Sequence, residues 1–303
     1  MENNCSFVCS RGLLKSCDFH SDNPQSSSPV DVNHIYKMLD GNNMFDKMSI
    51  YVCTDVLPYF INVLLPNIKN TFYLLSGDSD VTVPGGSIYI GSPHEHTILS
   101  DVCFKLINNP LLIKWYAQNC VFDHPKVCQL PIGMDYHTIS NDPSKFWRDK
   151  EINEGTLPRH QEMILKNIRS NMKPYHERIC SVLITTNFEN NSCKIPSELV
   201  TNDYQEIPRT RLWKKMVQYT FIYSPYKSGM DCHRHWESLL LGCIPIMQSI
   251  GTNEMFEDLP VLIVKNYSDV TKELLENTIE EFKSKKFNYD KLLLKYWVDL
   301  FTN

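Results

Sequence analysis

The sequence predicts an α/β protein built from two α/β domains with a cleft between them. Three observations support this fold class. The chain has 303 residues, about twice the usual length of a single domain. Short apolar runs alternate with helix-like segments over residues 48–135, and again over 160–301. A polar stretch with prolines and a glycine, 140–160, separates the two series. Because strands that alternate with helices form βαβ units, each half is expected to hold a parallel sheet covered by helices.

In the first half, residues 21–33 are rich in Ser, Pro and Asn and are expected to be flexible. A flexible leader is therefore expected over 1–33, with an arm or a short N-terminal element before residue 21. The N-terminal domain is expected over 34–160. Its predicted helices are 57–70 and 96–120, the second with a break at Pro110. Its predicted strands are 48–53, 71–77, 87–92 and part of 127–135.

The C-terminal domain is expected over 161–303, and its last helix is one that can pack back on the N-terminal domain. Five segments have the pattern of helices: 160–173, 209–218, 231–242, 268–286 and 288–301. Four have the pattern of strands: 179–187, 220–225, 243–249 and 259–266.

Composition narrows the class of protein. Hydrophobic residues make up 42% and charged residues 21%, which excludes a disordered, collagen-like or coiled-coil chain. The formal net charge of −5 argues against a general nucleic-acid binder, because phosphate contacts need a basic surplus. A small anionic ligand held by two or three cations remains compatible with this charge.

The eleven cysteines indicate a reducing compartment, because their number is odd and no CxxC pair occurs. Cys5, Cys9 and Cys17 with His20 match no common zinc spacing, so no metal site is expected. No run of 18 apolar residues and no signal-peptide core occur in the sequence. A cytoplasmic protein without an integral membrane segment is therefore predicted.

The stretch 221–247 carries the most chemical information. A buried strand ends in a Pro/Gly loop, and a helix then begins with Asp231 as a plausible N-cap. A phosphate placed there meets free backbone N–H groups and the positive end of the helix dipole. Lys227 and Arg234 add cations, and Glu237 can accept hydrogen bonds from two ribose hydroxyls. The expected lining of the phosphate loop is Tyr226, Ser228 and Gly229.

An alternative reading of Arg234 and Glu237 is an exposed pair three residues apart on a helix. The combination with the strand, the glycine loop and the following Gly-Cys-Ile-Pro strand favours a ligand site. Gly242 is expected to end the helix, and Trp236, Leu239 and Leu240 are expected to face the core.

Residues 228–247, SGMDCHRHWESLLLGCIPIM, resemble the donor-nucleotide signature of exostosin-like glycosyltransferases, especially the compact soluble type of large DNA viruses and microbes. The matching positions are Arg234, Glu237, Gly242, Cys243, Ile244 and Pro245. Residues 258–271 look like the next strand and turn of that family. In the first half, 54–84 and 112–135 are similar to the acceptor-side half of the viral-type proteins.

The resemblance implies a GT-B fold, in which two Rossmann-like domains face a cleft, and an inverting transfer without a metal cofactor. It implies a UDP-sugar donor bound by the C-terminal domain and a glycan or glycoprotein acceptor; UDP-xylose is one guess among the UDP-sugars. It also suggests a host-cytoplasmic location if the protein is viral. Animal exostosins are anchored in the Golgi membrane, and the missing anchor helix here weighs against their polymer substrates.

An inverting transfer needs a base that deprotonates the acceptor hydroxyl. In such a fold the base is expected at the carboxyl end of an N-terminal-domain strand, where Asp80 is favoured, then Asp78, then Asp55. Each can equally be a turn or N-cap carboxylate. His94 and His96 form an alternative base pair on a loop.

Arg209 and Arg211 open a predicted helix and are expected to reach the departing diphosphate, although a solvated helix start is the alternative. Two rival functions stay open. Asp78-Ser79-Asp80 also fits the manganese site of a metal-dependent GT-A glycosyltransferase. The chain can also be a catalytically inactive module that binds a nucleotide sugar or a glycan.

Overall fold

The computed structural model describes residues 2–21, 33–41, 44–84, 101–142, 144, 148, 156–185, 194–203, 207–226, 229–249 and 253–302. The chain divides into two compact units, each assembled from several segments. Unit 1 comprises Met1–Phe7, Gly133–Tyr226 and His233–Leu293, and unit 2 comprises Val8–Ile132, Lys227–Cys232 and Leu294–Asn303.

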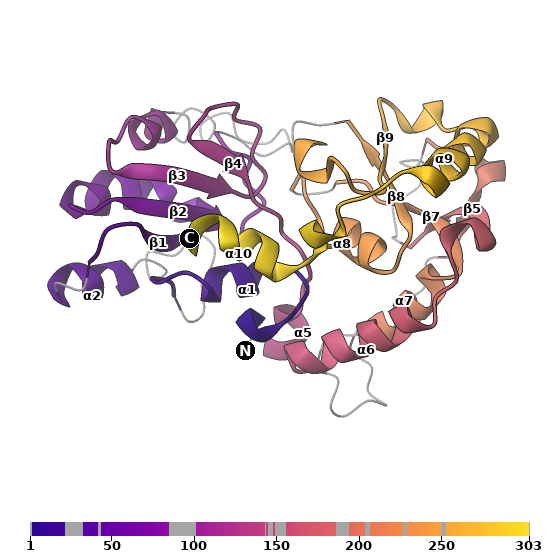
Figure 1. The fold of residues 1–303 in the computed structure, drawn as a ribbon, viewed down its shortest axis with the longest axis horizontal. Helices are drawn as coiled ribbons and strands as arrows, with labels where there is room; N and C mark the ends of the chain where they lie inside the picture. The colour runs from indigo at the N-terminus through magenta and orange to yellow at the C-terminus, as the bar shows by residue number, and fades with distance from the viewer. Residues whose placement is uncertain are drawn as a thin grey trace. The chain divides into compact units, whose positions relative to one another are not determined.

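Unit 2 contains a parallel sheet in the order β1-β2-β3-β4 (Figure 1). Its strands are β1 (Met48–Cys53), β2 (Phe72–Gly77), β3 (Leu112–Ala117) and β4 (Val127–Gln129). The sequence MSIYVC of β1 is buried at all six positions, as expected for a parallel strand covered on both faces. Helical turns α3 (Leu57–Tyr59), η4 (Phe60–Leu64) and η5 (Leu65–Asn67) connect β1 to β2, and α2 (Asn33–Gly41) precedes β1.

One expected element in unit 2 is wrong. We predicted a helix over 96–120. Within the described part of that range, 101–120, helix covers 101–107, and Leu112–Ala117 forms β3 in the interior of the sheet. The run LLIKWYA lies after Pro110, which cannot continue the helix, and its apolar and aromatic residues suit a buried strand. The predicted strand 87–92 lies outside the described residues.

Unit 1 contains a second all-parallel sheet, in the order β6-β5-β7-β8-β9. Its strands are β5 (Ile179–Ile184), β6 (Val200–Asn202), β7 (Tyr219–Tyr223), β8 (Ile244–Gln248) and β9 (Leu262–Val264). Its helices are α5 (His137–Asn141), α6 (Pro158–Ser170), α7 (Arg209–Met216), α8 (His233–Leu240) and α9 (Lys272–Ser284). The chain order reverses between β5 and β7, which is the topological switch point of this doubly wound sheet.

The predicted fold class is confirmed: the chain is α/β, with two Rossmann-like units that each hold a parallel sheet. Within the described ranges, no helix is both long enough and apolar enough to cross a membrane.

Residues 2–21, at the start of the expected leader, form a short folded N-terminal element. They hold η1 (Glu2–Asn4) and α1 (Ser10–Lys15), and the core of α1, Leu13 and Leu14, is completely buried. In unit 1, the buried Glu162 carboxylate accepts hydrogen bonds from the backbone N–H groups of Ser6, at 2.8 Å, and Phe7, at 3.1 Å. Buried apolar side chains and a buried hydrogen-bond acceptor therefore hold residues of this segment in place. Met1 and residues 22–32 of the expected leader lie outside the described residues.

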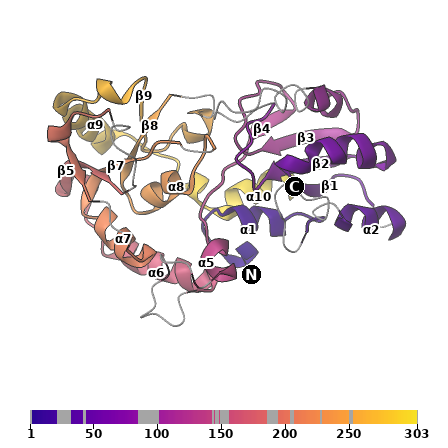
Figure 2. The ribbon, with the colours of Figure 1, turned by 180° about the vertical axis from the view of Figure 1, so that it is seen from behind.

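The last helix, α10 (Leu294–Thr302), belongs to unit 2. The Tyr116 hydroxyl on β3 donates to the carbonyl of Leu300 at 2.8 Å. In both views α10 lies beside α1, so helices from the two ends of the sequence pack together (Figure 1 and Figure 2).

Candidate functional site

The carboxyl edge of the unit 1 sheet is the natural ligand edge, because open α/β sheets bind ligands there at the switch point. The strand β7 ends at Tyr223 beside this point, and α8 begins at His233. Since α7 and α8 run between strand ends, their first residues also lie at the carboxyl edge. The sequence pattern strand–loop–helix thus puts Arg209 and the first turn of α8 at one edge.

The helix α8 is anchored by its apolar face. Trp236, Leu239 and Leu240 are at most 1% exposed, which confirms the expected core face. Gly242 has φ +64, and the N–H groups of Gly242 and Cys243 donate to the carbonyls of Leu239 and Ser238 at 3.0 and 2.8 Å. This pair of bonds is a Schellman motif, so Gly242 ends the helix as predicted.

Arg209, the first residue of α7, connects two carboxylates of unit 1. Its Nη2 lies 3.1 Å from Oδ2 of Asp135, and its Nε lies 3.5 Å from Oε1 of Glu237. It also donates to the backbone carbonyl of Asp135 and, at 3.3 Å, to the side-chain oxygen of Gln161. The guanidinium is 12% exposed and the two carboxylates 9% and 10%, so the charges are shielded from water. We call Arg209, Asp135, Glu237 and Gln161 the arginine cluster.

Asp135 is held in its charged form. Burial by itself raises the pKa of this carboxyl, but His233, Arg209 and His137 together lower it well below its usual range. A backbone hydrogen bond from Thr138, at 2.9 Å, acts in the same direction.

Two histidines flank the arginine cluster. The Nδ1 of His233 donates to the carbonyl of Gly133 at 2.7 Å, since a carbonyl oxygen can only accept. The Nδ1 of His137 lies 3.3 Å from Oδ1 of Asp135, and the two imidazole centroids are 6.4 Å apart. The His233 hydrogen bond therefore joins the first residue of α8 to Gly133, in the segment just before α5.

The predicted donor residues are placed as follows. Arg209 and Glu237 are brought together in the arginine cluster. Arg234 is half-buried, and no other described residue forms a hydrogen bond or ion pair with its guanidinium. Tyr226 is half-buried three residues after β7, and Arg211 is exposed and lies outside the cluster. Lys227 and Ser228 lie outside the described residues.

Gly229 and Asp231 belong to unit 2, where they contact Asn119 or Ile132. A Cβ at Gly229 would lie 2.9 Å from Nδ2 of Asn119, so this buried position accepts only glycine without a shift. The backbone N–H of Asp231 donates to Oδ1 of Asn119 at 2.9 Å, and its carboxylate accepts from the N–H of Ile132 at 2.7 Å. The Asp231 carboxylate, which we expected to serve as the N-cap of α8, is thus a hydrogen-bond acceptor for the backbone of Ile132.

The sequence reasoning missed Asp135, Gln161, His137 and His233. The first two contact Arg209 from 74 and 48 residues away, and no local pattern around them signals this role.

The carboxyl edge of the unit 2 sheet holds the three predicted base candidates. Asp78 follows β2 with φ 57, and its carboxylate forms an ion pair with Nη2 of Arg11 at 3.1 Å. Asp55 follows β1 and accepts a 2.5 Å hydrogen bond from the Ser79 hydroxyl. Asp80 is exposed, and no hydrogen bond or ion pair joins its carboxylate to another described residue.

The Asp78-Ser79-Asp80 sequence was also the candidate for a metal site. Counting described residues only, no three His, Cys, Asp or Glu side chains cluster closely enough to hold an ion. His94 and His96, the alternative base pair, lie outside the described residues.

No protein-family model matches this sequence, and no curated protein matches it. Solved structures resemble it only in overall fold. The apo structure of OtsA is 11% identical, with a TM-score of 0.41, and the match covers 89% of this chain and 76% of that one. A UDP-forming α,α-trehalose-phosphate synthase from Burkholderia xenovorans is 10% identical, with a TM-score of 0.38 over 90% and 78% of the two chains. An α1,3-fucosyltransferase is 11% identical, with a TM-score of 0.36 over 96% and 95%.

Proposed function

We propose that the protein is a GT-B-type, inverting glycosyltransferase that takes a sugar from a UDP-sugar donor. The observation that carries this proposal is the arginine cluster at the carboxyl edge of the unit 1 sheet. It sets Glu237, of the Arg-x-x-Glu/Gly-Cys-Ile-Pro signature, beside the switch point at which doubly wound sheets bind nucleotides.

In this proposal Glu237 accepts hydrogen bonds from the ribose hydroxyls. Arg209 fixes the orientation of Glu237, because it already holds one carboxylate on each side. Arg234, whose guanidinium has no described protein partner, binds the diphosphate together with the start of α8. Arg209 is thus a positioning residue, which differs from the diphosphate contact expected from sequence.

Asp80 remains the proposed base. The carboxylate of Asp78 is already engaged in an ion pair with Arg11, at 3.1 Å. Asp55 is already an acceptor for Ser79. Asp80 is exposed at the same edge, so its oxygens can reach an acceptor hydroxyl.

A thermal-shift screen of the purified chain against a panel of UDP-sugars tests donor binding. The true donor is expected to raise the midpoint, with a smaller rise for UDP alone. The acceptor, a glycan or glycoprotein hydroxyl in this proposal, is then sought by transfer of the labelled sugar from that donor.

Two outcomes separate the rival functions. Full transfer in EDTA supports the metal-independent reaction, and abolished transfer that returns with Mn²⁺ would favour a GT-A-like use of Asp78 and Asp80. Donor binding without transfer to any of a broad set of glycans, and without slow hydrolysis of the donor, would favour an inactive binding module.

A further inference from the structure

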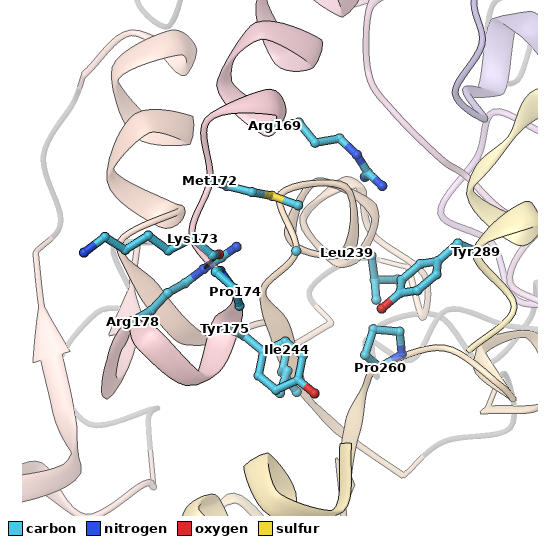
Figure 3. A pocket seen from close by; sticks show the side chains of 11 residues that line it. Arg169, Met172, Lys173, Pro174, Tyr175, Arg178, Leu239, Ile244, Pro260 and Tyr289 are labelled. Atoms are coloured by element: carbon cyan, nitrogen blue, oxygen red, sulfur yellow. Dashed lines mark hydrogen bonds between the residues drawn. The ribbon is translucent and has the colours of Figure 1, made fainter. Parts of the chain in front are cut away.

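A cavity of about 360 Å³ lies in unit 1, at the opposite end of α8 from its first turn (Figure 3). The end of α6, the turn that follows it, the end of α8 and the start of β8 form its walls, with Pro260 and Tyr289. Because α8 leaves the carboxyl edge and returns to the amino end of β8, this cavity lies at the amino edge of the sheet. It is therefore distinct from the proposed donor site.

Two arginines are fixed on the cavity wall. Nη1 of Arg169 donates to the carbonyl of Leu240 at 2.6 Å, and Nη1 of Arg178 donates to the carbonyl of Leu241 at 3.0 Å. Nε of Arg178 donates to the carbonyl of Lys173 at 2.7 Å. These bonds hold the two guanidinium groups by the end of α8, where cations also complement the helix dipole.

The same arginines keep unused donors. No carboxylate of a described residue pairs with Arg169 or Arg178, and neither Nη2 has a hydrogen-bond partner among those residues. Burial lowers the pKa of both guanidinium groups, but they stay charged because an arginine pKa is normally above 12. Two partly desolvated cations without a counter-charge favour the binding of an anion in the cavity beside them.

The other lining is apolar and phenolic. Met172, Leu239, Ile244 and Pro260 supply the apolar walls, and the side chain of Lys173 extends away from the cavity (Figure 3). Burial raises the pKa of Tyr289, so its hydroxyl stays protonated and able to donate at neutral pH. A volume near 360 Å³ falls within the range of about 300–1,000 Å³ that is typical of small-molecule sites.

The close approach of Met172 and Arg178 to the end of α8 depends on the missing side chain of Gly242. A Cβ there would lie 2.9 Å from Cε of Met172 and 3.0 Å from Nη2 of Arg178. Its left-handed backbone therefore ends α8 and also lets Arg178 approach the helix end.

We propose that this cavity is a second ligand site, which binds a small organic anion: a phosphate or carboxylate group attached to an apolar or ring-shaped body. The anionic group lies between Arg169 and Arg178, and the body lies against Leu239, Ile244 and Pro260. This site does not depend on the proposed function, because no residue of the arginine cluster lines it.

The test is a calorimetric titration of the full chain with phenyl phosphate and with benzoate. Benzyl alcohol, which lacks the charge, and inorganic phosphate, which lacks the ring, serve as comparison probes. Saturable binding of phenyl phosphate or benzoate, at least tenfold tighter than binding of both comparison probes, supports the proposal. No saturable binding of either up to millimolar concentration overturns it.

Variants locate the binding. Arg169→Met is expected to weaken binding of the anionic probe at least tenfold, and Tyr289→Phe, which leaves the helix end untouched, about threefold. The control is Arg159→Met, an exposed cation on the same helix α6 that does not line the cavity. Equal affinity in all three variants would overturn the proposal, as would loss of binding in Glu237→Gln, which would place the probe in the donor site.

Discussion

The acidic residues at the carboxyl edges of the two sheets differ in burial and in ion pairing. In unit 1, Asp135 and Glu237 are buried and share Arg209, so their charges are satisfied inside the protein. In unit 2, Asp78 has Arg11 as an ion-pair partner, whereas Asp80 is exposed and forms no ion pair with another described residue. A buried, internally paired cluster gives a fixed shape for binding, whereas an exposed carboxylate is available to take a proton. In the proposed function, the unit 1 edge therefore binds the donor and the unit 2 edge supplies the base.

The largest expected effect concerns the exposed carboxylate. Asp80→Asn is expected to lower the transfer rate by about 10²–10⁴-fold, the usual contribution of a general base, with little change in donor affinity. Asp78→Asn and Asp55→Asn are the matched controls at the same edge, and their transfer rates are expected to fall much less. Initial rates of sugar transfer, with donor binding measured separately, check this. A normal rate in Asp80→Asn would remove it as the base.

Arg209→Met tests the buried cluster. The substitution leaves two buried carboxylates without their cation and is expected to cost about 3–5 kcal/mol in the free energy of unfolding. Lys214→Met, an exposed cation on the same helix, should change it by less than about 0.5 kcal/mol. Urea unfolding monitored by circular dichroism measures both. Similar losses in the two variants would contradict the internal pairing.

The depressed pKa of Asp135 predicts a specific pH dependence. A carboxyl whose folded pKa lies below its unfolded value of about 3.9 stabilises the fold above that value, and this contribution is lost as pH falls toward the folded pKa. Asp135→Asn should therefore be less stable than wild type at pH 7, and the gap should narrow below pH 4. Thermal midpoints measured between pH 7 and pH 3 test this. A constant gap across that range would argue against the depressed pKa.

The smallest effect is expected at the pair in unit 2. Arg11 and Asp78 side chains are 11% and 13% exposed, so Arg11→Met is expected to cost about 1–2 kcal/mol, more than a surface pair and less than Arg209→Met. Lys37→Met, an exposed cation on α2, is the control. The urea midpoints of these variants are compared with that of Arg209→Met, which shows at which edge the ion pair contributes more to stability. An Arg11 effect larger than the Arg209 effect would reverse the comparison.

The sequence predicted those features that depend on neighbouring residues. The α8 core face and the Gly242 termination follow from local spacing, and the alternation of strands and helices was enough to predict two parallel sheets. The strand β3 was missed because it is a short, continuous apolar run next to a helix. The periodicity of such a run does not distinguish a buried strand from an extension of the helix.

The arginine cluster could be predicted only in part. Arg209 and Glu237 carried a sequence signal, but their contact joins α7 to α8, and Asp135 meets Arg209 from 74 residues away. Such pairs are brought together by the packing of the sheet and its helices, which no local pattern encodes. The anchoring of Ser6 and Phe7 was missed for the same reason, since their backbone N–H groups donate to Glu162, 156 and 155 residues away.

The most direct test of the central claim is calorimetric binding of UDP to wild type, to Glu237→Gln and to Glu257→Gln. Glu257 is an exposed acidic residue of unit 1 outside the arginine cluster, so it serves as the control. UDP is expected to bind wild type and Glu257→Gln equally. Its binding to Glu237→Gln is expected to be at least tenfold weaker, because hydrogen bonds to a charged acceptor are lost. Equal affinity in all three proteins, or no binding of UDP to wild type, would contradict it.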